Sequence, residues 1–148
     1  MKHQVVIDTI IKLWRESESI LLTGAANLDG DALGCLLALE AFGLSQGKTM
    51  TIVNEKPLSS LYDFLEAGER VFTQIPDQKY DAIYICDTGC FEMLGDIYTK
   101  NTELFKNTPT VNIDHHGSCY GDICWSTSGN EFASATMMIA RMIQEIGG

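Results

Sequence analysis

Residues 109–117 read Pro-Thr-Val-Asn-Ile-Asp-His-His-Gly, a short apolar run that ends in one carboxylate and two imidazoles. The apolar run predicts a buried strand, which places Asp114, His115 and His116 at its carboxyl end. Open α/β sheets bind their ligands at that edge. A solvated polar turn is the alternative explanation for these three residues. The interpretation therefore depends on what the other predicted strands carry at their ends.

Apolar runs and helical periodicities alternate along the whole chain. This alternation predicts right-handed βαβ units and therefore an α/β fold. We expect a Rossmann-like three-layer domain with a mainly parallel sheet and helices on both faces. Strands are predicted at 20–23, 48–53, 80–86 and 110–113, with an edge strand at 122–125; helices are predicted at 5–18, 31–46, 58–65, within 91–105, and at 132–146.

Length and composition predict one domain, residues 1–148, that is 45% hydrophobic and can bury a core. The chain stops where a helix would pass to the next strand, which suggests a truncated chain or an unusually short gene. No apolar run approaches the ~20 residues of a membrane helix, and the N-terminus is amphipathic. We expect a cytoplasmic, soluble protein.

The five cysteines are odd in number and have no Cys-x-x-Cys spacing. That pattern predicts neither a zinc knuckle nor a disulfide framework, and Cys86 is expected to pack in the core. The net charge is −10. A protein that binds long nucleic acid through its phosphates has a basic surface, so we expect no long duplex as a partner.

Aspartates also follow two other predicted strands. Asp29 and Asp31 follow the first one with a glycine between them, and Asp87 ends the third. Carboxylates with an imidazole suit Mn²⁺ or Mg²⁺, and histidine favours Mn²⁺. Asp31 has an alternative role as a helix N-cap, and Asp87 as part of a structural turn. Three strand ends with such side chains favour a convergent metal cluster over coincidence.

Other candidates for phosphate contact are weaker. Ser134 and Thr136 open the last predicted helix, where backbone amides attract anions. A helix start with small residues for close packing explains them equally well. The basic candidates are better explained as ordinary surface charges: Lys48, Lys56, Arg70 and Arg141.

The combined motifs resemble those of the DHH phosphoesterase family, named for its Asp-His-His sequence. The family's first motif is similar to His-x-Asn-Pro-Asp-Gly-Asp-Ala-x-Gly-Ser, and residues 25–35 read AANLDGDALGC. Asp87 matches the second motif and 114–116 the third. Residues 114–122 and 133–136 resemble the branch that cleaves short oligoribonucleotides and dephosphorylates adenosine 3′,5′-bisphosphate. The resemblance spans nearly the whole chain.

The resemblance implies a site with two Mn²⁺ ions, with Mg²⁺ as the alternative. The implied ligands are Asp29 and Asp87 for one ion, and Asp31, Asp87 and His115 for the other. The implied catalytic residues are Asp114, which orients a ligand, and His116, which faces the substrate phosphate. Further implied substrate contacts are Asn27 and Ser134.

The implied reaction is hydrolysis of short oligonucleotides or nucleotide phosphates. Exopolyphosphatase, inorganic pyrophosphatase and RecJ-type exonuclease activities are alternatives within the same class. A homodimer is an open alternative for the assembly. The substrate partner is expected to be a small phosphorylated molecule or a short oligonucleotide. We expect it to be bound by the metal ions and not along a basic groove.

The chain departs from the family in three respects. Ala25 replaces the first histidine of the family's motif, so one metal position should be weakened, and a single ion is the alternative to two. The family's fourth motif and its C-terminal DHHA1-type domain are absent from this sequence. These departures motivate a second hypothesis, in which the chain is a degenerate metal- or nucleotide-binding module without turnover.

Overall fold

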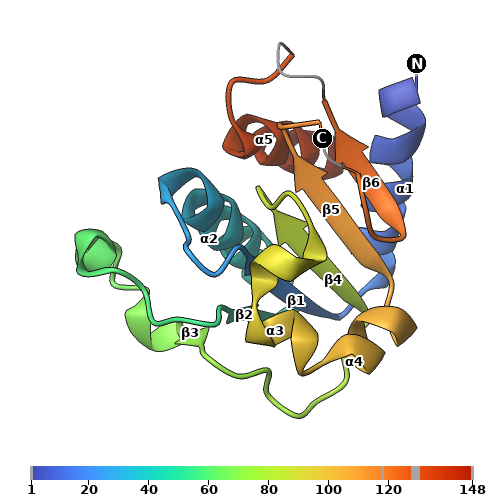
Figure 1. Cartoon of the computed structure of the whole chain (residues 1–148). Coiled ribbons are helices and arrows are strands. Elements are labelled where there is room, and N and C mark those ends of the chain that lie inside the picture. Colours follow the sequence, from blue (N-terminus) through green and yellow to red (C-terminus); the bar gives the residue numbers. More distant parts are fainter. Residues whose placement is uncertain (1, 118, 128–130, 148) are drawn as a thin grey trace.

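The computed structural model describes residues 2–117, 119–127 and 131–147. Its centre is a six-stranded sheet in the order β3-β2-β1-β4-β5-β6, in which every neighbouring pair is parallel (Figure 1). The strands are β1 (Ser19–Gly24), β2 (Thr49–Val53), β3 (Val71–Phe72), β4 (Ala82–Cys86), β5 (Thr110–Asp114) and β6 (Ile123–Ser126).

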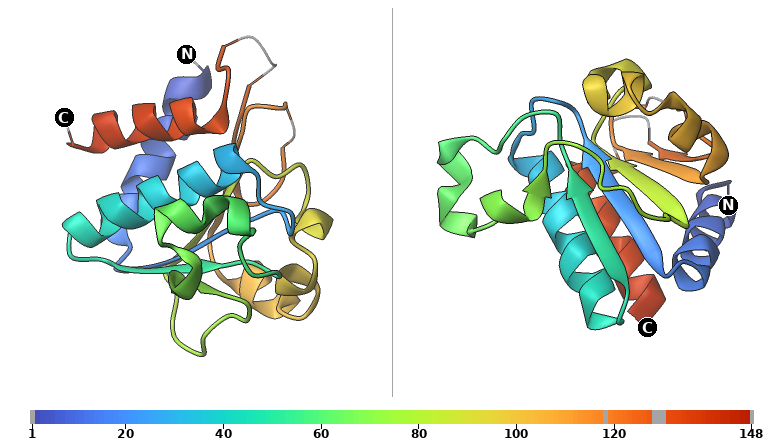
Figure 2. Two further views of the ribbon diagram at one scale, coloured as in Figure 1. Left: turned by 90° about the vertical axis from the view of Figure 1, so that its left-hand side faces the viewer. Right: turned by 90° about the horizontal axis from the view of Figure 1, so that it is seen from below.

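Helices cover both faces of the sheet (Figure 2). One face of the sheet packs against three long helices and the other against short ones. Each of these two interfaces buries its own cluster of hydrophobic side chains. The long helices are α1 (Lys2–Glu16), α2 (Gly30–Ser45) and α5 (Ala135–Gly147). The short ones are η3 (Phe91–Leu94), α3 (Asp96–Thr99) and α4 (Thr102–Asn107), while η1 (Ser60–Leu65) and η2 (Gly68–Arg70) lie between β2 and β3.

The residues of β4 show why the sheet needs both layers. Tyr84 and Cys86 point into the cluster under the long helices, whereas Ile83 and Ile85 point into the other. Successive side chains of a strand face opposite sides of a sheet, so a strand that is apolar at every position must be covered twice. All five residues of β4 are buried. The predicted three-layer α/β fold is thereby confirmed.

Several element predictions differ from the structure in detail. The helix expected within 91–105 is three short segments, because Gly95 (φ 62°) and the connection at Asn101 interrupt it. The segment at 58–65 is a 3₁₀ helix, and the last helix begins at Ala135, three residues later than predicted. The two-residue strand β3 was not predicted because it is too short to show an alternating pattern.

The expectation of no disulfide is wrong for one pair, since Cys119 and Cys124 form one. They lie five residues apart, so no spacing rule indicates the bond. Cys86 is fully buried, as predicted. None of the helices in the described ranges is both long and apolar enough to cross a membrane.

Candidate metal centre

The carboxyl ends of β4 and β5 bring two of the predicted motifs together. Cys86 and Ile113 are partners in the parallel register, so the residues that follow them are neighbours. The amide of Asp87 donates to the carbonyl of Ile113 at 2.9 Å. Asp87 itself has φ 52°, a left-handed conformation that Asp and Asn adopt more readily than most residues. The backbone thus turns sharply where the carboxylate must reach the site.

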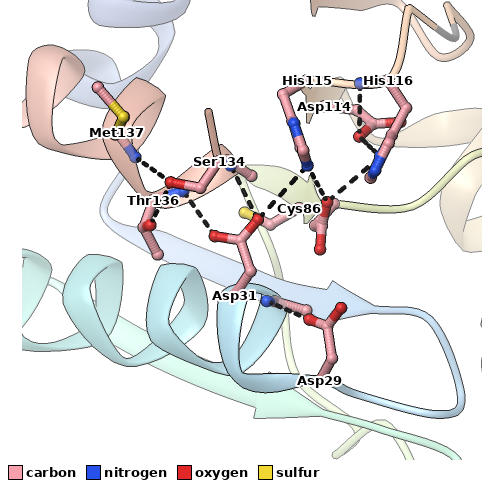
Figure 3. Close-up of polar contacts among 12 residues, drawn as sticks. Asp29, Asp31, Cys86, Asp114, His115, His116, Ser134, Thr136 and Met137 are labelled. Atoms are coloured by element: carbon pink, nitrogen blue, oxygen red, sulfur yellow. Dashed lines mark hydrogen bonds and ion pairs between the residues drawn. The ribbon is translucent and has the colours of Figure 1, made fainter. Parts of the chain in front are cut away.

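His115 lies between two carboxylates, that of Asp87 directly after β4 and that of Asp31 in the first turn of α2. Its Nε2 is 3.4 Å from Asp87 Oδ1 and 3.6 Å from Asp31 Oδ2 (Figure 3). Ligands about 2.1 Å from an octahedral ion lie about 3 Å apart at adjacent corners. The separation of His115 from each of the two carboxylates is therefore close to that between ligands of one cation. A group of four residues that does not include Asp31 offers ligand atoms within 4.8 Å of one another: Asp87, Asp114, His115 and His116.

Asp87 is the most perturbed carboxyl of this cluster. Burial, followed by the charges of Asp31 and Asp29, raises the pKa of Asp87 to about 7. Its side chain is 5% exposed, and its Oδ1 has no hydrogen-bond partner among the described residues. A buried carboxylate oxygen without a partner is costly, because burial removes its water. Such an oxygen indicates a position at which a cation would be stabilised.

Asp114 and His116 form a second pair beside the cluster. Asp114 is fully buried and accepts both the amide of His116 at 3.2 Å and its ring Nδ1 at 2.8 Å. The hydrogen bond to the carboxylate raises the pKa of His116. It also assigns the proton to Nδ1, which leaves Nε2 of the 62% exposed ring for a partner outside the chain. Asp114 thus orients His116, whereas the resemblance implied that it orients a metal ligand.

Asp29 and Asp31 each receive amides of a helix N-terminus, but of different helices. Asp29, rather than Asp31, is the N-cap of α2 and accepts the amide of Ala32 at 2.8 Å. The alternative role expected for Asp31, a cap of its own helix, is therefore wrong. Asp31 instead accepts the amides of Ala135 and Thr136, both at 2.9 Å, at the start of α5 (Figure 3).

Ser134 is engaged in local contacts at the start of α5. Its hydroxyl lies 2.8 Å from Thr136 Oγ1 and accepts the amide of Met137 at 3.3 Å. Asp31 already receives the two preceding amides of this helix. The N-terminus of α5 is thus occupied by side chains of the protein, which favours a structural role at the helix start over the phosphate contact expected for Ser134.

A cavity of ≈ 350 Å³ opens beside the cluster. Three predicted site residues contribute to its lining together with Asn27, which places the first motif next to the third. The lining consists of Ala25, Asn27, Asp29, Ala32, Asp87, Gly89, Met93 and His116. Met93 was not predicted, because the region that contains it has no clear helical period. Met93 is 47% exposed, which is unusual for a large apolar side chain and would have marked it as a site residue. This exposure cannot be recognised from the sequence.

These residues fit a divalent cation on three grounds. The donors are carboxylate oxygens and imidazole nitrogens, the set that Mn²⁺ and Mg²⁺ accept. Asp87 has a buried oxygen without a hydrogen bond. The spacing of His115 with Asp31 and Asp87 leaves these atoms too far apart for hydrogen bonds but near enough for a shared ion.

The fold and the cluster define an α/β domain with a candidate cation centre at the carboxyl edge of its sheet. The chain is similar in fold to a crystal structure of an exopolyphosphatase-related protein from Bacteroides fragilis, with a TM-score of 0.83 and 20% sequence identity. The match covers 97% of this chain and 44% of the other, so the chain spans less than half the length of this neighbour. No family model and no curated protein matches the sequence.

Proposed function

We propose that this chain is the metal-binding domain of a divalent-cation-dependent phosphoesterase that acts on short oligonucleotides or nucleotide phosphates such as adenosine 3′,5′-bisphosphate. One observation carries the proposal: His115 Nε2 lies 3.6 Å from Asp31 Oδ2 and 3.4 Å from Asp87 Oδ1, and this Asp87 oxygen is buried without a hydrogen bond among the described residues. The likeness in fold to an exopolyphosphatase-related protein supports the same class of reaction.

Each residue of the cluster has a role in this proposal. Asp31, Asp87 and His115 would hold one Mn²⁺, and Asp29 with Asp87 the other. The ions would supply Lewis acidity toward a phosphoryl oxygen and an activated water. His116, oriented by Asp114, donates a hydrogen bond from Nε2 to a phosphate oxygen when its ring is protonated. The raised pKa of His116 extends that protonated form to higher pH.

Ala25 favours a second candidate function. It lines the cavity at the position where the family motif has a histidine, and a methyl group cannot bind a metal. The second candidate is a binding module that holds one cation or a nucleotide without turnover. An Ala25→His variant separates the two candidates: a gain in Mn²⁺ affinity and turnover would identify this position as a lost ligand, whereas no gain in either would count against that idea.

The proposal is tested by Mn²⁺ calorimetry and by phosphate release on one set of proteins. The set comprises the parent chain, Asp87→Asn, and Asp63→Asn as a matched control on the exposed η1 segment. Asn keeps the left-handed backbone of residue 87 accessible, so a loss of binding reports on the carboxylate. We expect Mn²⁺ binding and hydrolysis of adenosine 3′,5′-bisphosphate by the parent and the control, and neither by Asp87→Asn.

Other outcomes select among the alternatives. Hydrolysis of tripolyphosphate in preference to nucleotides would replace the proposed substrate with polyphosphate. Mn²⁺ binding without release of phosphate from any substrate would favour the binding module. Absence of Mn²⁺ binding by the parent chain would overturn the proposal.

A further inference from the structure

A second cavity adjoins the candidate metal centre. It has a volume of ≈ 280 Å³ and shares Asn27 with the first cavity. Its lining combines apolar walls with polar groups and one cation: Ala26, Asn27, Leu28, Asn54, Lys56, Pro57, Leu58 and Ser59. Small-molecule sites have this composition, in which a few placed polar groups interrupt an apolar lining.

Lys56 is the cation of this second cavity. Its Nζ donates to Asn27 Oδ1 at 3.1 Å, which places the ammonium group at the boundary between the two cavities. Within the described ranges, no carboxylate lies within ion-pair distance of Lys56, whereas five other basic side chains have a carboxylate partner: Lys12, Arg70, Lys79, Lys100 and Arg141. An unpaired ammonium next to a neutral amide is available to an anion.

Asn54 fixes the position of Lys56. Asn54 is 2% exposed, and its Nδ2 donates to the carbonyls of Ala26 at 3.1 Å and Lys56 at 2.9 Å. One buried amide group thereby ties the first-motif loop to the loop after β2. Its Oδ1 has no hydrogen-bond partner in the part of the chain that the structure describes. This oxygen is buried as well, so Asn54 acts by holding the two loops together and not by contacting a ligand.

The negative charge of the protein would repel a phosphorylated substrate, and the ammonium group of Lys56 would offset part of this repulsion. The net charge is −10, and four aspartates surround the candidate reaction centre. A substrate with two phosphates meets repulsion from this surface wherever a cation does not offset it. We propose that the cavity around Lys56 and Asn54 is a nucleotide subsite in which Lys56 binds a second phosphate of the substrate, away from the phosphate that is hydrolysed. The inference rests on the proposed function for the location of the reacting phosphate.

Binding of two nucleotides tests the subsite. The chain is titrated, in the presence of Ca²⁺, with adenosine 5′-monophosphate and, separately, with adenosine 3′,5′-bisphosphate. Each nucleotide is recovered afterwards to verify that it has not been hydrolysed. We expect the bisphosphate to bind about tenfold more tightly, as one charge-assisted contact allows. Lys56→Gln should reduce this preference to near unity, and Lys56→Arg should retain most of it. Lys12→Gln, which changes the net charge equally on α1, should keep it.

Salt provides a second readout. The preference of the parent chain should fall as ionic strength rises from 0.1 to 1 M, where the screening length shortens from about 10 to about 3 Å. A preference that survives Lys56→Gln, the absence of a preference in the parent, or binding of neither nucleotide would overturn the inference. Turnover in Mn²⁺ is measured separately. A Lys56-dependent preference without turnover contradicts the proposed function alone, and turnover with no effect of Lys56 contradicts the subsite alone.

Discussion

Replacing Asp87 by Asn should stabilise the metal-free protein, and more so at high pH than at low pH. The ordinary pKa of this carboxyl is 3.8, and burial with the nearby Asp31 and Asp29 raises it to about 7 in the folded protein. Ionisation is then less favourable in the folded than in the unfolded chain. The free energy of unfolding therefore falls as pH rises from about 4 to about 7. An amide at residue 87 removes this effect.

The magnitude follows from the two pKa values. At pH 8 the carboxyl is ionised in both states, and the shift corresponds to a penalty of about 4 kcal/mol. At pH 5 the folded carboxyl is protonated and the unfolded one is mostly ionised, which leaves a penalty of about 2 kcal/mol. Asp87→Asn should thus raise the free energy of unfolding by about 2 kcal/mol more at pH 8 than at pH 5. At pH 8 the melting temperature should rise by about 10 °C.

The assay is urea unfolding at both pH values in the presence of a chelator, because a bound cation would stabilise the parent selectively. Asp63→Asn serves as the control for loss of one exposed carboxylate. Adding Mn²⁺ should reverse the order of stability at pH 8, since only the parent retains the carboxylate that the ion would use. A stability gain that is equal at the two pH values, or a variant less stable than the parent at pH 8, would refute the reasoning.

Two further predictions concern the neighbours of Asp87. Asp31→Ala should accelerate hydrogen exchange at the amides of Ala135 and Thr136 and destabilise the chain by about 1–2 kcal/mol, because α5 loses its capping carboxylate; unchanged exchange at these amides would contradict that role. Asp114→Asn should lower the pKa of His116, measured by NMR of its ring. The stability that the His116–Asp114 pair contributes is present at low pH and lost as pH rises through the raised pKa of His116, so this part of the pH dependence should disappear in Asp114→Asn.

The fold could be predicted because buried parallel strands leave a simple pattern. The runs at 20–23, 80–86 and 110–113 are apolar at nearly every position; the last two are followed directly by Asp87 and by Asp114 with its histidines, and a short loop separates the first from Asp29 and Asp31. Parallel strands place their carboxyl ends at one edge, so convergence of Asp31, Asp87 and His115 followed from topology. The short segments of 91–105 could not be predicted, since tertiary packing rather than helical period determines their limits.

The remaining features of the site depend on contacts between distant segments. Asp31 caps a helix that begins 104 residues later, and no local motif indicates such a pairing. Lys56 resembles an ordinary surface charge in the sequence, and only its bond to Asn27 relates it to the site. The bond between Cys119 and Cys124 likewise depends on the path of the loop before β6, which the spacing of cysteines does not reveal.

The contact between Asp31 and α5 has a consequence for biosynthesis. A ribosome synthesises the chain from its N-terminus, so a segment can pack only after the segments that it contacts have been synthesised. Asp29, Asp31 and Asp87 emerge well before His115, and the amides that hold the Asp31 carboxylate emerge later still. The nascent chain therefore cannot present the full cluster until α5 has been made. Binding of the proposed cation by the complete cluster would therefore require that α5 has been synthesised and has packed against α2.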